Sequence, residues 1–128
     1  MKKTISVLLS GVILSGCMMT NQAFNVTPKS TDLDGYWSAN DGFAHTHHWF
    51  IRPDGTGVYC DVKLMSPSGQ LDPLVMDIAI VDNKAYLNNT YEIVRLSPNA
   101  FKASTWGGSF ALNFKRAPHP PAACKQFF

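Results

Sequence analysis

Three of the four histidines stand together in the segment Ala44-His45-Thr46-His47-His48-Trp49. Alternate residues of a β-strand share a face, so His45 and His47 would lie on one face with their Cα atoms about 7 Å apart. Two imidazoles at that distance can share a zinc or copper ion if a third ligand lies close to them. The sequence offers three candidates for this third ligand: Asp41, His48 and His119.

The same segment also has an interpretation without a metal. If Trp49 and Ile51 point into a core, the histidines are polar residues at the entrance of their strand, and their spacing matches no structural zinc pattern.

The sequence contains no Gly-x-Ser-x-Gly, His-Glu-x-x-His or phosphate-loop motif. Glu92 is the only glutamate and the aspartates stand mostly in turns, which disfavours a carboxylate pair for glycoside hydrolysis. We therefore predict neither an enzyme nor a bound cofactor.

The N-terminus combines a basic start with an apolar run. Lys2 and Lys3 precede the apolar stretch 5–14, which Ser6, Ser10 and Gly11 interrupt. This stretch is too short for a permanent helix across a bilayer core, which needs about 20 residues. The order of charge, length and polarity is typical of a secretory signal.

The segment Leu14-Ser15-Gly16-Cys17 ends this run and resembles the lipobox of bacterial lipoproteins. The resemblance implies that residues 1–16 are removed as a signal peptide and that Cys17 carries acyl chains such as palmitate. Residues 17–32 are polar and irregular and would form a flexible tether between the lipid and the domain. Several acyl chains hold a protein stably at a membrane, which one chain does not. Met18 stands where an aspartate would retain such a lipoprotein at the inner membrane, so the implied location is the periplasmic face of the outer membrane.

Removal of the signal changes both the size and the charge of the chain. Of 128 residues, 112 remain, enough for one domain with a single core. Lys2 and Lys3 leave with the signal, so the basic residues fall from 11 to 9 against 9 acidic residues, and the net charge falls from +2 to zero. A basic surface for nucleic acid is therefore not supported.

The cysteines form an odd set of three until Cys17 is assigned to lipid. The remaining pair, Cys60 and Cys124, would lie in an oxidising compartment, so we predict a disulfide between them. Closing a loop of about 65 residues would stabilise the domain by roughly 4 kcal/mol in the chain-entropy model. Two buried free thiols are the alternative.

Beyond residue 32 the sequence is typical of an all-β domain. Short apolar runs alternate with turn residues about every 8 to 12 positions, as in a sandwich or barrel, and helical spacing is missing. We predict a barrel or sandwich domain over residues 33–116, followed by a Pro-rich tail over 117–128 that Cys124 pins. The predicted antiparallel meander has eight strands, at Asp34–Asn40, His47–Arg52, Thr56–Leu64, Leu74–Val81, Lys84–Leu87, Thr90–Leu96, Ala100–Ser104 and Ser109–Lys115.

Alternation within these strands assigns side chains to faces. In the third strand, Val58, Cys60, Val62 and Leu64 share one face, which leaves Tyr59 opposite the expected core. Tyr59 and one of Trp49 and Phe50 would then line a shallow cavity or a protein-binding patch. The run Trp106-Gly107-Gly108 before the last strand predicts a bulge or a close approach of backbones.

Two family resemblances bear on architecture and function. Gly35-Tyr36-Trp37 at the start of the first strand resembles the Gly-x-Trp of lipocalin-like barrels, which implies that Trp37 plugs one end and that a basic residue after the last strand, Arg116 or Lys115, lies over it. Val58-Tyr59-Cys60 and the loop Ser66-Pro67-Ser68-Gly69 resemble segments of periplasmic inhibitors of C-type lysozyme, although here no residue separates the tyrosine from the cysteine.

The leading functional interpretation is a lipid-anchored envelope lipoprotein whose β domain is a binding or interaction module. Its partner would be a small apolar ligand or a protein. The first alternative is an inhibitor or immunity protein that blocks a hydrolase such as lysozyme. The second alternative is a metal-binding envelope protein that uses His45, His47 and His48.

Overall fold

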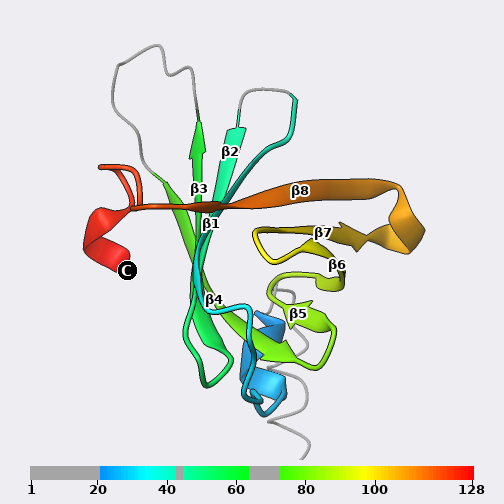
Figure 1. The fold of residues 1–128 in the computed structure, drawn as a ribbon. Coiled ribbons are helices and arrows are strands. Elements are labelled where there is room, and N and C mark those ends of the chain that lie inside the picture. Colours follow the sequence, from blue (N-terminus) through cyan, green and yellow to red (C-terminus); the bar gives the residue numbers. More distant parts are fainter. Residues whose placement is uncertain (1–20, 43–44, 64–72) are drawn as a thin grey trace, which may run out of the picture.

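The computed structural model describes residues 21–42, 45–63 and 73–128, and it shows an antiparallel β-barrel (Figure 1). Each strand pairs with the next, and β8 closes the barrel on β1 through the pair Trp37 and Arg116. The prediction of an all-β meander of eight strands is confirmed, and the closure makes it a barrel rather than a sandwich. The strands are β1 (Gly35–Asn40), β2 (His45–Ile51), β3 (Thr56–Lys63), β4 (Leu74–Val81), β5 (Lys84–Tyr86), β6 (Thr90–Ser97), β7 (Ala100–Thr105) and β8 (Phe110–Ala117).

In the described parts of the chain, three short 3₁₀ helices accompany the barrel: η1 (Gln22–Asn25), η2 (Trp106–Gly108) and η3 (Lys125–Phe127). The strand ends lie close to the predicted positions. The largest differences are at His45, where β2 begins ahead of the predicted His47, and at Ala117, where β8 continues past the predicted Lys115. Within the described ranges, no helix is long and apolar enough to cross a membrane.

The turn between β2 and β3 shows how local sequence sets these boundaries. The Asp54 carboxylate accepts hydrogen bonds from the Thr56 backbone N–H at 2.9 Å and from the Thr56 hydroxyl at 2.6 Å. Gly55 has a φ of 90°, and a Cβ there would meet the backbone of Lys29. A residue with a side chain would therefore be strained at this position and would displace the N-terminal segment.

Aromatic side chains fill the centre of the barrel. The Trp49 and Phe114 rings lie 4.5 Å apart between centroids, Phe101 and Phe114 lie 5.0 Å apart, and Trp37 meets Phe101 edge-on at 4.6 Å. All four side chains are almost fully buried, and aliphatic residues from β2, β4 and β8 pack around them. Rings at such distances contribute packing energy beyond their buried area. This part of the barrel is a packed core and not a hollow ligand cavity.

The face assignment of β3 is reversed relative to the sequence prediction. Tyr59 points into the barrel and belongs to the main core, whereas Cys60 and Val62 point outward and form a separate cluster with Cys124. Both faces of β3 are buried because the C-terminal tail covers the outer one. Alternation alone cannot identify the inner face of such a strand.

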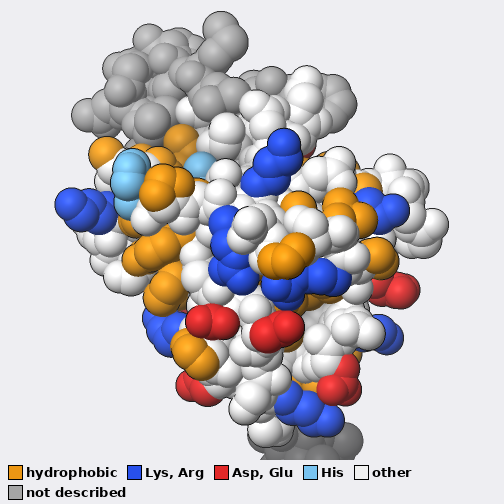
Figure 2. All heavy atoms as spheres, viewed as in Figure 1, with side chains coloured by type: hydrophobic (Ala, Val, Ile, Leu, Met, Phe, Trp, Pro, Cys, Tyr) orange, Lys and Arg blue, Asp and Glu red, His pale blue; other side chains and the backbone are white. Residues whose placement is uncertain are grey.

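The predicted disulfide joins Cys60 and Cys124, with an S–S distance of 2.07 Å and a sequence separation of 64. Beside it, the Phe128 ring stacks on Phe50 at 5.7 Å, and Phe50 stacks on Tyr36 at 4.7 Å. The tail therefore lies against the outer faces of β1, β2 and β3. In Figure 2 hydrophobic side chains gather on the left, where Figure 1 places this tail, and acidic and basic side chains are interspersed over the rest of that view.

The segment expected to be a flexible tether is held against the barrel from Asn21 onward. The backbone N–H groups of Gln22 and Lys29 donate to the carbonyls of Leu87 and Ile80, at 2.6 and 2.9 Å. Ile80 belongs to β4 and Leu87 follows β5, so the segment pairs with backbone carbonyls on and beside these strands. The signal and Cys17 lie outside the described residues, so the lipidation site stays a prediction.

Candidate functional site

Polar side chains converge inside one end of the barrel, where β2 begins and β3 ends. In the register of the two strands, His47 stands opposite Asp61, and Trp49 stands opposite Tyr59. Alternation directs His45, His47, Tyr59 and Asp61 inward, and Asp41 joins them from the end of β1. We call these five residues the histidine end: Asp41, His45, His47, Tyr59 and Asp61.

Hydrogen bonds and ion pairs connect these side chains. His45 Nδ1 lies 2.8 Å from Asp61 Oδ1, and His47 Nε2 lies 3.2 Å from Asp41 Oδ2. The other nitrogen of His47, Nδ1, is 3.0 Å from the Tyr59 hydroxyl. Because a carboxylate only accepts, His47 Nε2 carries the proton toward Asp41. Both ring nitrogens of His47 are thus engaged, which fixes the plane of its imidazole.

Burial differs sharply within this group. The His47 and Asp41 side chains are each 9% exposed, whereas the His45 side chain is 34% exposed. The His47 ring also stacks on Tyr59 at 5.9 Å and meets Phe110 edge-on at 6.5 Å. His47 is therefore a fixed inner residue of the histidine end, and His45 is the side chain that solvent and ligands can reach.

The two tyrosines near this end are held in their neutral form. Burial raises the pKa of Tyr59 far above its ordinary value, and the negative charge of Asp61 adds to the effect. Burial and then the charge of Asp61 also raise the pKa of Tyr91. Neutral hydroxyl groups in this position can both donate and accept hydrogen bonds at any physiological pH.

Beneath these polar groups lies a tryptophan with an unused donor. Trp49 is 1% exposed and its ring meets Tyr91 edge-on at 5.8 Å. Its indole Nε1 has no hydrogen-bond partner among the described residues. An unpaired buried donor costs free energy, and native proteins rarely leave one without a role or a bound water.

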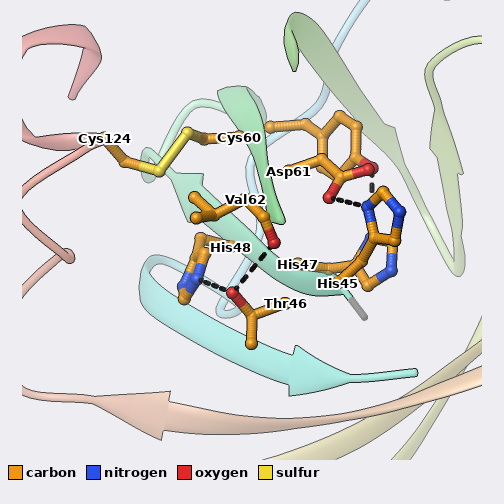
Figure 3. Close-up of a disulfide and its surroundings, with 9 residues drawn as sticks. His45, Thr46, His47, His48, Cys60, Asp61, Val62 and Cys124 are labelled. Carbon is orange, nitrogen blue, oxygen red and sulfur yellow. Dashed lines mark hydrogen bonds and ion pairs between the residues drawn. A yellow bond between two sulfur atoms is a disulfide. The ribbon is translucent and has the colours of Figure 1, made fainter. Parts of the chain in front are cut away.

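The structure does not bring the three clustered histidines together. His48 points to the opposite side of β2, where its Nε2 lies 2.9 Å from the Thr46 hydroxyl, as Figure 3 shows beside the disulfide. Burial lowers the pKa of His48, and the neighbouring His47 lowers it further. His119 lies in the exposed tail. The described part of the chain contains no group of three or more His, Cys, Asp or Glu side chains placed to hold a metal ion.

The opposite end of the barrel contains the predicted plug. Trp37 is 1% exposed, and its Nε1 donates to the Leu33 carbonyl at 2.7 Å. The Arg116 guanidinium lies 4.3 Å from the Trp37 ring centroid, and Arg95 approaches the same ring at 5.8 Å. We call Leu33, Trp37, Arg95 and Arg116 the tryptophan end.

The sequence left open which basic residue covers Trp37. Lys115 pairs with Ser38 and points outward, so it is Arg116 that lies over the tryptophan. Arg116 also donates from Nη1 to the Asp34 carbonyl at 2.8 Å and from Nε to the Pro98 carbonyl at 3.1 Å. These bonds tie the end of β8 to the chain entering β1 and to the turn between β6 and β7.

Sequence reasoning named the histidines but missed two of their partners. The alternation that places Tyr59 away from the expected core places Asp61 there as well, although their two-residue spacing matches that of His45 and His47. In an antiparallel hairpin, two such pairs meet on one face when the turn sets the register. Two segments carry the resemblance to lysozyme inhibitors. Tyr59 of the first segment lies inside the barrel, and the second segment, the loop Ser66-Pro67-Ser68-Gly69, falls outside the described residues.

Comparison of the chain with protein-family models, with curated proteins and with solved structures found no match.

Proposed function

We propose that this protein is a lipid-anchored lipoprotein of the bacterial outer membrane whose β-barrel binds a ligand or protein partner at the histidine end. The location rests on the sequence alone, on the segment Leu14-Ser15-Gly16-Cys17 and on Met18 after it. The neutral formal charge of the mature chain argues against nucleic acid as the partner.

One observation carries the choice of site: the two ends of the barrel are built differently. Around Trp37, Phe101 and Phe114 the interior of the described barrel is apolar, and these side chains are almost fully buried. At the histidine end, ionisable and aromatic groups stand together, and the His45 side chain is 34% exposed. Convergent polar groups above an apolar floor are typical of binding sites that orient their ligand through hydrogen bonds.

The chemistry of this end defines what it can recognise. His45 Nε2 has no hydrogen-bond partner among the described residues, while His45 Nδ1 lies within hydrogen-bond distance of Asp61. Tyr59 holds a neutral hydroxyl, and Trp49 Nε1 is an unused donor below it. A partner group that enters here should therefore carry a hydrogen-bond acceptor for the indole and a polar atom for His45.

The anchor is tested by replacing the lipidated cysteine. Cys17→Ala should abolish incorporation of labelled fatty acid, leave the precursor uncut and release the protein from outer-membrane fractions. The control Cys60→Ala removes a different cysteine and should still incorporate label. Labelled Cys17→Ala protein would refute the lipoprotein assignment.

The binding site is tested by native mass spectrometry of the full-length protein recovered from cells. An added small mass would identify a ligand, and an added intact protein would identify a partner, including a hydrolase in the inhibitor alternative. His45→Gln should remove the added mass, whereas the matched control His119→Gln in the tail should retain it. Retention by His45→Gln would place the contact elsewhere, and a fully loaded species that survives both changes would contradict the proposed site.

A further inference from the structure

The turn between β7 and β8 holds an exposed tryptophan in a strained backbone conformation. Trp106 has a φ of 54°, followed by 67° at Gly107 and 93° at Gly108. A bulky side chain rarely occupies this left-handed region, because its Cβ approaches its own backbone. A Cβ added at Gly107 or Gly108 would have no other atom within 4 Å, so the predicted close approach of backbones is wrong. The glycines instead allow the positive φ angles of an exposed turn.

The turn presents the Trp106 ring to solvent. Trp106 is 66% exposed, whereas Trp37 and Trp49 are each 1% exposed. The Ser109 backbone N–H and hydroxyl both donate to the Trp106 carbonyl, at 3.2 and 2.9 Å, and the ring leans on Phe110 at 6.0 Å. Strain that persists in an otherwise regular hairpin, around a side chain that contributes little to the core, points to a role in binding.

A groove runs from this tryptophan over the outer faces of β5, β6 and β7. Its volume is about 480 Å³, within the roughly 300 to 1,000 Å³ of small-molecule sites. Lys84, Glu92 and Ser104 stand directly opposite one another across the three strands, and Thr90 adds a further hydroxyl. In Figure 1 the turn lies at the tip of the β7–β8 hairpin, on the opposite side of the barrel from the C-terminal tail.

The polar side chains of the groove are available to a ligand. Among the described residues, Lys84, Glu92 and Ser104 form no ion pair and no side-chain hydrogen bond. An ammonium, a carboxylate and the Ser104 hydroxyl provide donors and acceptors side by side, whereas the Thr90 hydroxyl donates to Gln22 Oε1 at 2.7 Å and can only accept from a ligand. An apolar ligand would desolvate these groups without compensation, and a polyanion would meet the negative charge of Glu92.

A saccharide fits both halves of this site. A pyranose ring exposes C–H groups on one face, which pack on the electron-rich face of an indole, and hydroxyls on its rim, which pair with charged and hydroxyl side chains. We propose that the groove formed by Lys84, Glu92 and Ser104 beside the exposed Trp106 ring is a saccharide-binding site, independent of the histidine end.

The test uses the full-length lipidated protein in a zwitterionic detergent without a sugar headgroup. Because Trp106 is the exposed tryptophan, we expect its fluorescence to change saturably with tri-N-acetylchitotriose or maltotriose, at a Kd of about 1 mM or below. Co-sedimentation with purified cell-wall sacculi distinguishes a polymeric glycan from a free oligosaccharide. Absence of binding to both oligosaccharides and to sacculi would overturn the proposal.

Trp106→Gly separates binding from folding. Glycine accepts the left-handed backbone without strain, so the melting temperature should stay the same or rise while saccharide binding falls at least about tenfold. Glu92→Gln should weaken binding while the fold remains intact. The control Leu96→Ala removes another exposed apolar side chain, on β6, and should bind like the wild type. A lowered melting temperature in Trp106→Gly, or unchanged binding, would assign the tryptophan a structural role instead.

Discussion

Each end of the barrel contains a buried tryptophan beside charged side chains, but the two ends differ in how these groups are paired. At the tryptophan end, the Trp37 indole N–H is paired with Leu33, and two arginines lie against its ring. At the histidine end, the Trp49 indole N–H is unpaired among the described residues, and the charged groups around it are acids and histidines. An end with satisfied donors contributes stability, whereas an end with unsatisfied and titratable groups is suited to binding. Substitutions at the first end should therefore lower the free energy of unfolding, and those at the second should change binding and the pH dependence of stability.

Trp37→Ala should have the largest effect. It removes a fully buried ring, the hydrogen bond to Leu33 and the stacking partner of Arg116, so we expect a loss of about 5 kcal/mol in the free energy of unfolding, at the upper end for large aromatic residues. Urea unfolding followed by circular dichroism measures it. A loss below about 1 kcal/mol would show that this end is no more structural than the other.

Removal of the disulfide tests whether the packed interior keeps the barrel stable when the tail is no longer covalently attached to β3. The double variant Cys60→Ser, Cys124→Ser opens a covalent loop with a sequence separation of 64, which predicts a loss of about 4 kcal/mol. Reduction of the wild type in urea should give a similar loss, and reduction of the double variant should give none. Wild-type urea unfolding curves that are the same with and without reductant would contradict this prediction.

Arg116→Met keeps the aliphatic length of the side chain but removes the charge over Trp37 and the bonds to Asp34 and Pro98. Since Arg116 is exposed, we expect a loss of about 1 to 2 kcal/mol. Lys115→Met, one residue away and on the outer face, is the matched control and should change stability by less than about 0.5 kcal/mol. Equal effects of the two variants would argue against a specific role of Arg116.

Tyr59→Phe should lower the free energy of unfolding by about 1 kcal/mol at neutral pH, because His47 Nδ1 loses its buried partner, and should also change how stability depends on pH in alkali. The folded state raises the pKa of Tyr59, so the neutral phenol is favoured in the native protein, and this contribution is fully present below the unfolded pKa of about 10 and lost as the pH rises above it. The free energy of unfolding should therefore fall by about 1.4 kcal/mol per pH unit for this group, and Tyr59→Phe should remove that slope.

Tyr91→Phe sharpens the same test, because the pKa of Tyr91 is raised as well. Each variant should remove part of the alkaline loss, and the double variant should remove more than either. Unfolding midpoints from pH 9 to about pH 11 supply the measurement. Identical slopes in the wild type and the double variant would refute the assignment of neutral tyrosines to the histidine end.

Local signals predicted most of the barrel because its strands are short and separated by strong turns. Asp54 and Gly55 form the β2–β3 turn through the bonds of Asp54 to Thr56 and the positive φ of Gly55, and both signals lie within a few residues of the turn. In β8, Leu112 and Phe114 are buried while Asn113 and Lys115 are exposed, as alternation predicts for a strand with one solvated face.

The candidate site was predictable only in part. The position of His45 and His47 on one face follows from their spacing, but the pairing of His45 with Asp61 depends on the register between β2 and β3. The groove beside Trp106 unites residues from β5 to the turn after β7, which no local pattern connects. Side chains far apart in the chain meet only when the sheet has formed and closed.

The sequence by itself determined the all-β class and the turns, since these follow from residue type and short-range geometry. The plug tryptophan was implied by the resemblance of Gly35-Tyr36-Trp37 to lipocalin-like barrels, and the cysteine pair by the assignment of Cys17 to lipid. The tertiary structure decided which face of β3 lies inside. Tyr59 and Cys60 are both apolar enough for a core. Tyr59 lies in the barrel interior, and Cys60 is buried on the outer face under the tail that Cys124 holds. Alternation shows which side chains share a face, but only closure of the barrel and docking of the tail determine which face becomes the interior.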